Sequence, residues 1–190
     1  GYMDVTNANY RLEKNGKVRV DGANWLKSGT YNVKLEGAKI TGYQTSLLVL
    51  LRDQNYVENA KTWVSKLSNF LKKQIKEKME LDTPLYSLEF RLIGVNGTLG
   101  ELETKVSEPT EVGVLCIITS KKTSISNEIA KLINPFLLHY PLTDNEELPT
   151  FAFPYSPVHS DRGCVYEFAL NHTLELNHPM EAFRIKTSEV

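Results

Sequence analysis

Apolar and polar positions alternate along much of the start of the chain, which is typical of strands with one exposed face. Between Tyr10 and Val20 this alternation is interrupted by Asn15-Gly16, a pair that readily adopts the positive φ angles of a tight hairpin turn. A further short strand is expected over residues 31–35. The chain is therefore predicted to begin with a β-rich leader built around a β-hairpin.

The pattern changes in the next segment. Over residues 45–51 the alternation gives way to a continuous apolar run, as expected of a central strand with no face left for water. Asn55 and Glu58 then have the spacing of a reciprocal N-terminal cap, and apolar residues recur at helical spacing as far as Ile75. A core strand followed by a long amphipathic helix is expected.

The second half of the chain predicts further strands and a second helix. Residues 85–93 and 112–118 have strand patterns, and the second of these is apolar on both faces. Ser124 is expected to cap a shorter helix, which Pro135 should stop or kink. Strand character resumes over residues 165–170.

The order of these elements predicts the fold class. It corresponds to an α+β, ferredoxin-like split β-α-β-β-α-β sandwich with an N-terminal β-hairpin extension, whose two helices cover one face of the sheet. In that fold strand four neighbours strand one. Cys116 and Cys164 would then lie about two strand spacings (~9–10 Å) apart, beyond disulfide reach, so both are expected to be free thiols.

A chain of 190 residues is expected to form a single domain over residues 1–190. Its predicted parts are the leader over residues 1–42, the ferredoxin-like core over residues 43–172 and a C-terminal extension over residues 173–190. Because Gly1 rather than a methionine comes first, the chain is interpreted as a segment excised from a longer protein.

The helices of such a fold leave one face of the sheet without a cover. Residues 47–51 and 112–118 are apolar on both faces, so the second face also needs to be covered. The candidates are the leader strands before Thr45, the Pro-rich stretch over residues 151–157, and a second subunit. A homo-oligomer is the expected assembly.

Composition and charge narrow the function classes. Hydrophobic residues make up 41% of the chain and charged residues 24%, as in ordinary globular proteins. The 22 basic and 23 acidic side chains give a net charge of −1, which predicts neither a nucleic-acid partner nor attraction to a membrane surface. Lysines 72, 73, 76 and 78 are interpreted as the solvated end of a helix. No apolar run is long enough to span a bilayer, and a cytoplasmic location is expected.

Several segments resemble the acyclic terpene utilisation family of bacterial proteins. They are residues 92–97, 151–157, 161–163 and 165–172, together with residues 10–13 and 18–23 of the leader. The match is to the carboxy-terminal half of that family. The resemblance implies a larger amino-terminal α/β domain, absent here, and a role in the catabolism of branched acyclic terpenoids or related carboxylic acids, often through CoA thioesters. It also implies that this part acts as a lid, a dimerisation surface or a partial wall of the site.

The strongest candidate site is a loop that enters the last predicted strand. His159, Asp161 and Arg162 lie within four positions, and together they could pair with a carboxylate or phosphate and shuttle protons. In the alternative interpretation, Asp161 and Arg162 make ion pairs that stabilise the loop, while Gly163 permits a bulge. Both interpretations remain open at this point.

Two further pairs of residues are weaker candidates for a functional site. Near the end of the last strand, His172 could act as acid, base or metal ligand and Asn171 could donate to a carbonyl oxygen, unless His172 is a hydrogen-bonded structural residue. Asn96 and Gly97 belong to a glycine-rich connector whose amides could bind an anion, or they simply form a turn. The histidines and cysteines lack zinc-site spacing and no nucleotide fingerprint is present, so no metal and no cofactor is expected.

The sequence is compatible with three functions. The first is the C-terminal domain of an acyclic-terpene-utilisation-like catabolic protein, acting on branched acyl or hydroxy-acid compounds and enzymatic only as part of the longer chain. The second is a noncatalytic module for oligomerisation or small-carboxylate binding. The third is independent hydrolase or lyase chemistry at His159, Asp161 and Arg162. Whether the chain is itself an enzyme stays open.

Overall fold

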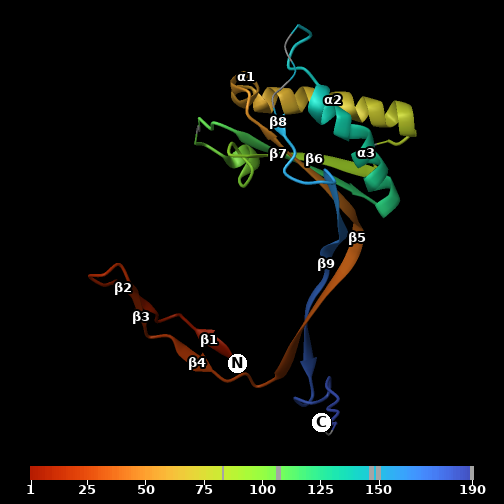
Figure 1. The fold of residues 1–190 in the computed structure, drawn as a ribbon. Coiled ribbons are helices and arrows are strands. Elements are labelled where there is room, and N and C mark those ends of the chain that lie inside the picture. Colours follow the sequence, from red (N-terminus) through yellow and green to blue (C-terminus); the bar gives the residue numbers. More distant parts are fainter. Residues whose placement is uncertain (83, 106–107, 146–147, 149–150, 189–190) are drawn as a thin grey trace. The chain divides into compact units, whose positions relative to one another are not determined.

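The computed structural model describes residues 1–82, 84–105, 108–145, 148 and 151–188 (Figure 1). Within them the fold is mixed α+β, with three α-helices, an antiparallel five-stranded sheet and two separate hairpins. The strands are β1 (Tyr2–Asp4), β2 (Asn9–Leu12), β3 (Val18–Asp21), β4 (Asn24–Leu26), β5 (Tyr31–Leu51), β6 (Tyr86–Ile93), β7 (Val112–Ser120), β8 (Phe151–Ala152) and β9 (His159–Leu176). The helices are α1 (Gln54–Glu58), α2 (Ala60–Met79) and α3 (Thr123–His139), with a 3₁₀ turn at Gly100–Leu102. The predicted α+β class is confirmed.

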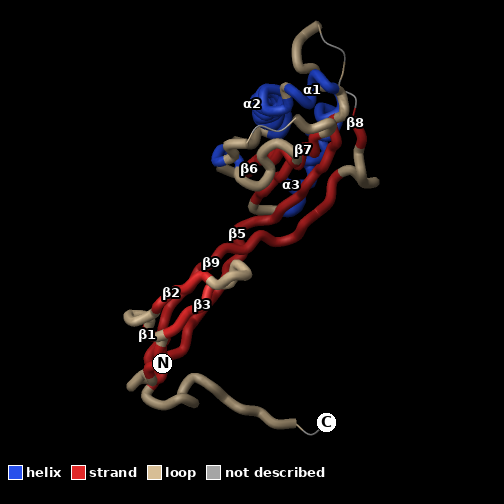
Figure 2. Tube along the Cα trace, turned by 90° about the vertical axis from the view of Figure 1, so that its left-hand side faces the viewer, coloured by secondary structure: helices blue, strands red, loops and turns tan. Residues whose placement is uncertain are grey.

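The described residues fall into two compact units. One comprises residues 1–38 with residues 168–188, and the other comprises residues 39–167. Strands β5 and β9 each contribute residues to both units, and they run alongside each other as paired strands (Figures 1 and 2). The expectation of one domain over residues 1–190 stays a prediction.

The unit of residues 39–167 contains the large sheet. Its strand order is β6-β7-β5-β8, and β9 also pairs with β5. Cys116 of β7 lies opposite both Leu47 of β5 and Phe90 of β6. Helices α2 and α3 lie on the same side of these strands (Figure 1). Cys116 and Cys164 are both free cysteines.

The core lies between the sheet and its two long helices. Its fully buried side chains include Leu47, Val49 and Leu51 of β5, Val114, Cys116 and Ile118 of β7, Trp63, Leu67, Leu71 and Ile75 of α2, and Ile129, Ile133 and Leu137 of α3. The helical members recur every four positions, so each helix presents one apolar face to the sheet. Burial in this apolar layer raises the pKa of the Cys116 thiol.

Three long-range hydrogen bonds fasten the segment after α3 to α1 and α2. Trp63 Nε1 donates to the Tyr140 carbonyl oxygen at 2.8 Å, and Lys66 Nζ donates to the Leu142 carbonyl oxygen at 3.0 Å. The Leu142 amide donates to the Tyr56 hydroxyl oxygen at 3.1 Å, and both of these residues are buried. Because the bonded residues lie far apart in the sequence, these contacts fix how the helix layer closes over the core.

Replacing Tyr56 with phenylalanine is expected to lower the free energy of unfolding by about 1–3 kcal/mol, because the buried Leu142 amide loses its acceptor. Chemical denaturation of the full chain, followed by circular dichroism, measures the change. Tyr155→Phe is the matched control, since the Tyr155 side chain is largely exposed. Equal losses in the two variants would contradict this role of Tyr56.

The first helix begins differently from the prediction. Asp53 caps α1, and its carboxylate accepts hydrogen bonds from the amides of Asn55 and Tyr56 at 3.0 and 3.4 Å. Asn55 thus lies inside the first turn, while Glu58 accepts from the side chain of Gln54. The predicted reciprocal cap of Asn55 and Glu58 is wrong, because a carboxylate two residues earlier is a stronger acceptor at the positive end of the helix.

The second predicted helix also differs at both ends. α3 begins at Thr123 after Lys122, which makes no side-chain cap hydrogen bond, and Ser124 lies inside the helix. The predicted Ser124 cap is therefore wrong. The helix also does not stop at Pro135 but runs on to His139. Buried apolar side chains on either side of the proline hold this helix against the sheet, which offsets the one missing amide hydrogen bond.

The leader contains two antiparallel hairpins. The β2–β3 hairpin is the one predicted, with Tyr10 opposite Val20 and with a φ of 76° at Gly16 in the turn. The β1–β4 hairpin, in which Met3 lies opposite Trp25, was not predicted. Its strands are three residues long, too short for a period-two pattern to identify them.

Strand β5 is much longer than expected. The predicted short strand over residues 31–35 and the core strand over residues 45–51 are parts of one continuous strand. Gly37 lies inside it. At Gly42, a Cβ atom would lie only 2.7 Å from the Ser120 carbonyl oxygen, so glycine serves a close approach of two backbones there.

Candidate functional site

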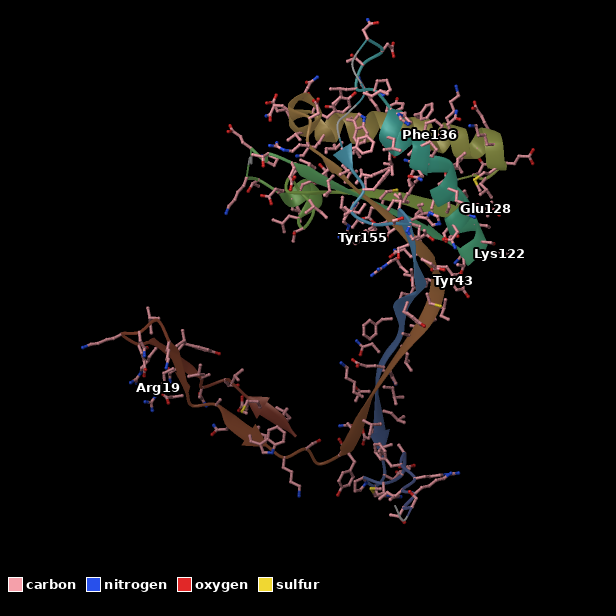
Figure 3. All side chains as sticks on the ribbon, viewed as in Figure 1. Arg19, Tyr43, Lys122, Glu128, Phe136 and Tyr155 are labelled. Carbon is pink, nitrogen blue, oxygen red and sulfur yellow. The ribbon has the colours of Figure 1, made fainter. Side chains whose placement is uncertain are left out.

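A cavity of about 590 Å³ lies against the face of the sheet opposite the helices, within the unit of residues 39–167, and is called the open-face cavity. It is lined by Gln44, Ser46 and Leu48 of β5, by Leu115 and Ile117 of β7, and by residues 155–160 and Arg162 around the start of β9. Figure 3 shows Tyr155 and Phe136 of α3 on opposite sides of the sheet. The Pro-rich stretch, one of the covers considered from the sequence, thus covers part of the second face.

The floor of the open-face cavity is formed by cross-strand pairs. Leu48 lies opposite Leu115, and Ser46 lies opposite Ile117. Because the neighbouring residues of each strand point into the core, these side chains point to the other face. Gln44 Nε2 donates to a threonine hydroxyl of β7 at 3.2 Å, which holds this amide in place. The floor is therefore apolar along most of its length and polar at one end.

The wall of the open-face cavity is formed by the segment that contains the predicted site residues His159 and Arg162. His159 is half-buried and Arg162 is exposed, and both line the cavity. Asp161 does not line it, because Asp161 Oδ1 accepts a hydrogen bond from the Gly163 amide at 2.8 Å. Gly163 has a φ of 77°, in the region that favours glycine. The structure brings together two of the three predicted residues, and the third shapes the turn between them and the rest of β9.

Arg162 brings a positive charge to the lining of the open-face cavity. Glu89 of β6, opposite the floor residue Ile117, is paired with Arg91. The lining contains neither aspartate nor glutamate, and none of the ion pairs between described residues includes Arg162. A guanidinium group presents five N–H donors in a planar fork that matches the two oxygens of a carboxylate. The arrangement is suited to a ligand with an anionic head and an apolar body.

The other predicted site residues lie elsewhere. Asn96 and Gly97 lie in the turn after β6, where the Asn96 amide donates to a carbonyl oxygen of that strand at 2.9 Å and the Asn96 carbonyl oxygen accepts from Gly100 at 2.8 Å. These internal bonds favour the turn interpretation over an anion cradle. Asn171 and His172 are exposed on β9, in the unit that contains residues 168–188.

Some residues of the cavity were not among the predicted site residues. A partial indication of Gln44 and Ser46 was present in the sequence, since they are polar residues beside or within an otherwise apolar run. What the sequence did not show is that Ser46 lies opposite Ile117, because strand register depends on the whole sheet. Tyr155 left no signal beyond its place in the Pro-rich stretch.

A second cavity, of about 690 Å³, lies beside the beginning of α2. Its lining includes Glu58, Glu103 and Glu108, which outnumber Lys61 and Lys105. None of His159, Asp161, Arg162, Asn171 and His172 is among its lining residues. The open-face cavity is therefore the candidate site.

The described residues contain neither a candidate metal site nor a membrane-spanning helix. Among the described residues, no group of three or more His, Cys, Asp and Glu side chains could hold a metal ion. None of the described helices is long and apolar enough to cross a membrane. Comparison of the chain with protein-family models, with curated proteins and with solved structures found no match.

Proposed function

We propose that this chain is the C-terminal domain of an acyclic-terpene-utilisation-like protein, and that its open-face cavity binds the carboxylate form of a branched acyl compound. Arg162 binds the carboxylate, while aliphatic side chains of the floor contact the branched hydrocarbon. Any chemistry on the ligand is shared with the larger amino-terminal domain that the family resemblance implies. The observation that carries the proposal is a cavity free of acidic side chains, with an arginine at its rim and Leu48, Leu115 and Ile117 in its floor.

The size and polarity of the cavity support this ligand class. A volume of about 590 Å³ lies within the range of about 300–1,000 Å³ that is typical of small-molecule sites. Hydrogen bonds to a charged group contribute about 1.5–3 kcal/mol each, and a guanidinium can make two of them to one carboxylate. Burial of methyl groups on the aliphatic floor adds about 0.8 kcal/mol for each group removed from water.

The family resemblance points to the same place. Two of the segments that carry it, residues 151–157 and 161–163, contain Tyr155, Pro157 and Arg162 of the cavity lining. The residues that resemble the family thus coincide with the wall of the cavity. This coincidence supports a ligand related to the branched carboxylic acids with which the family is associated.

We also propose the ferredoxin-like arrangement for the sheet of residues 39–167. Strand order β6-β7-β5, with β9 beside β5, supports it, as does the position of α2 and α3 on one face. In this arrangement the second face of the sheet is free to carry a ligand.

Independent hydrolase or lyase chemistry has less support. A histidine base is usually oriented by a carboxylate, but the Asp161 carboxylate accepts from the Gly163 amide. Among the described residues, His159 has no hydrogen bond to a carboxylate that would orient it. Binding without catalysis by this chain alone is the better-supported alternative.

Titration calorimetry of the full chain with 3,7-dimethyloctanoate and with the matching amide tests the proposal. We expect the acid to bind at least tenfold more tightly, since only the carboxylate can form the charged pair with Arg162 and tenfold corresponds to about 1.4 kcal/mol. The two ligands have the same hydrocarbon, so the floor contributes equally to both. Equal affinities, or no binding of the acid, would contradict the proposal.

A further inference from the structure

The unit of residues 1–38 with residues 168–188, called the terminal unit, has almost no interior of its own. Among its described residues only Leu176 is buried, whereas seventeen large apolar side chains are exposed. Two-stranded ribbons without a third layer are at best marginally stable in water. A stable terminal unit therefore needs another surface to cover it.

The β2–β3 hairpin shows the arrangement most clearly. Antiparallel register places Tyr10 opposite Val20 and Leu12 opposite Val18, so the four side chains share one face. Their exposed fractions range from 49% for Val20 to 79% for Leu12. Figure 3 shows the side chains of this segment, around Arg19, on a ribbon of single thickness. The hairpin thus has a complete apolar face without a covering layer.

The polar side of the terminal unit supplies its own counter-ions. On the opposite face of the hairpin Arg11 lies across from Arg19, and Arg19 Nε pairs with Asp21 Oδ2 at 3.0 Å. On β5, Lys34 pairs with Glu36. Arg19 and Lys34 thus have counter-ions within the chain, and the exposed charges are solvated, so burial is needed for the apolar faces and not for the charged ones.

The terminal-unit parts of β5 and β9 repeat the pattern. Tyr31, Leu35 and Gly37 share one face of β5, and Leu170 and Leu174 share one face of β9. A Cβ atom on Gly37 would lie 3.3 Å from the Leu170 Cβ, so the two rows lie on the same side of the ribbon. This ribbon also presents an apolar face, in which Leu170 is 46% exposed.

We propose that the terminal unit is the interface of a homodimer, in which the apolar faces of the β2–β3 hairpin and of the β5–β9 ribbon pack against the terminal unit of a second copy. At roughly 100 Å² of accessible surface each, the eight exposed apolar side chains of these two faces offer about 800 Å² per chain. A stable interface of standard size buries about 800 Å² on each partner. The exposed apolar surface is therefore of the size that a stable dimer needs.

Charge also favours a second copy as the partner. The described residues of the terminal unit include eight basic and six acidic side chains, so two such surfaces repel each other only weakly. A unit without a core needs its cover whenever the chain is folded, and an identical chain is always available. In a two-fold dimer each apolar face would meet the same face of its partner.

Analytical ultracentrifugation of the full chain at micromolar concentration tests the proposal. We expect a mass of about 43 kDa, twice the chain mass of 21.5 kDa. The variant Leu12→Glu with Val18→Lys places opposite charges across from each other, which preserves hairpin pairing but removes half of its apolar face. Its dimer dissociation constant should rise at least tenfold. Arg11→Glu, on the polar face of the same hairpin, should leave the dimer unchanged.

A monomeric unmodified chain would overturn the proposal, as would a double variant that dimerises as tightly as the unmodified chain. If circular dichroism shows that the double variant is unfolded, amide hydrogen exchange of the unmodified chain decides instead. Protection of β2 and β3 amides that is lost on dilution into the monomer range supports a buried hairpin face. Exchange as fast as in an unstructured peptide at all concentrations would refute it.

Discussion

Arg162→Gln is expected to weaken binding of 3,7-dimethyloctanoate to the open-face cavity by about 10–150-fold, because charge-assisted hydrogen bonds contribute about 1.5–3 kcal/mol. Among the described residues no other arginine or lysine lines the cavity, so none of them replaces the lost guanidinium. Binding of the matching amide should change less than threefold, since the amide depends mainly on the floor. Calorimetric titration of both ligands against the full-length variant measures the two effects.

Two further variants separate charge from shape and from nonspecific effects. Arg162→Lys keeps the positive charge but loses the planar fork, so its affinity should lie between those of the unmodified chain and Arg162→Gln. Arg11→Gln removes an exposed arginine of β2, which lies in the other unit and does not line the cavity. If Arg11→Gln weakened binding as much as Arg162→Gln, the effect would be one of general charge and the assigned role of Arg162 would be wrong.

Trp63→Ala is expected to lower the free energy of unfolding by about 3–5 kcal/mol, the cost of removing a large aromatic side chain from a packed core. Trp63 is fully buried on α2, its ring lies edge-on to that of Tyr56 with centroids 6.1 Å apart, and Trp63 Nε1 donates to the Tyr140 carbonyl oxygen. Small domains have only about 5–15 kcal/mol of stability in total. The substitution therefore removes a large fraction of it, and denaturant titration of the full chain measures the loss.

A second substitution at the same position divides this loss into its parts. Trp63→Phe keeps an aromatic ring but removes the donor to Tyr140, so it should cost about 1–3 kcal/mol. Leu102→Ala is the control, because Leu102 is 79% exposed and surface changes usually stay within about 0.5 kcal/mol. A Trp63→Ala variant as stable as the Leu102→Ala variant would show that the core has been placed incorrectly.

The predictions from the sequence succeeded where structure is set by nearby residues. The β2–β3 hairpin depends on the turn angles available to Asn15-Gly16, and the helices follow the spacing of their apolar residues. The first residue of a helix was harder to predict, because several neighbouring side chains can act as the N-terminal cap. Asp53 and Asn55 both have side chains able to cap a helix, and the pattern alone did not show that the carboxylate of Asp53 reaches the first amides.

Features that depend on distant pairing were missed. The continuity of β5 through Gly37 depends on β9, which pairs with it from the other end of the chain. The residues of the open-face cavity also divide into those predictable from local sequence and those that depend on strand pairing. His159 and Arg162 could be found because they lie close together in one loop, whereas Ser46 joins them only through the register of β5 with β7. Nothing in the local pattern of residues 43–46 predicts that register.

The two strands shared between the units have a consequence for how this protein can be dissected. Domain boundaries usually fall in exposed linkers, where a chain can be shortened or divided without loss of paired backbone. Here the division near residues 38 and 168 cuts through β5 and β9, which are hydrogen-bonded partners. Any fragment limited to residues 39–167 would end inside both strands and would lose the part of the β5–β9 ribbon that lies beyond the division. Expression of the full chain keeps this ribbon whole.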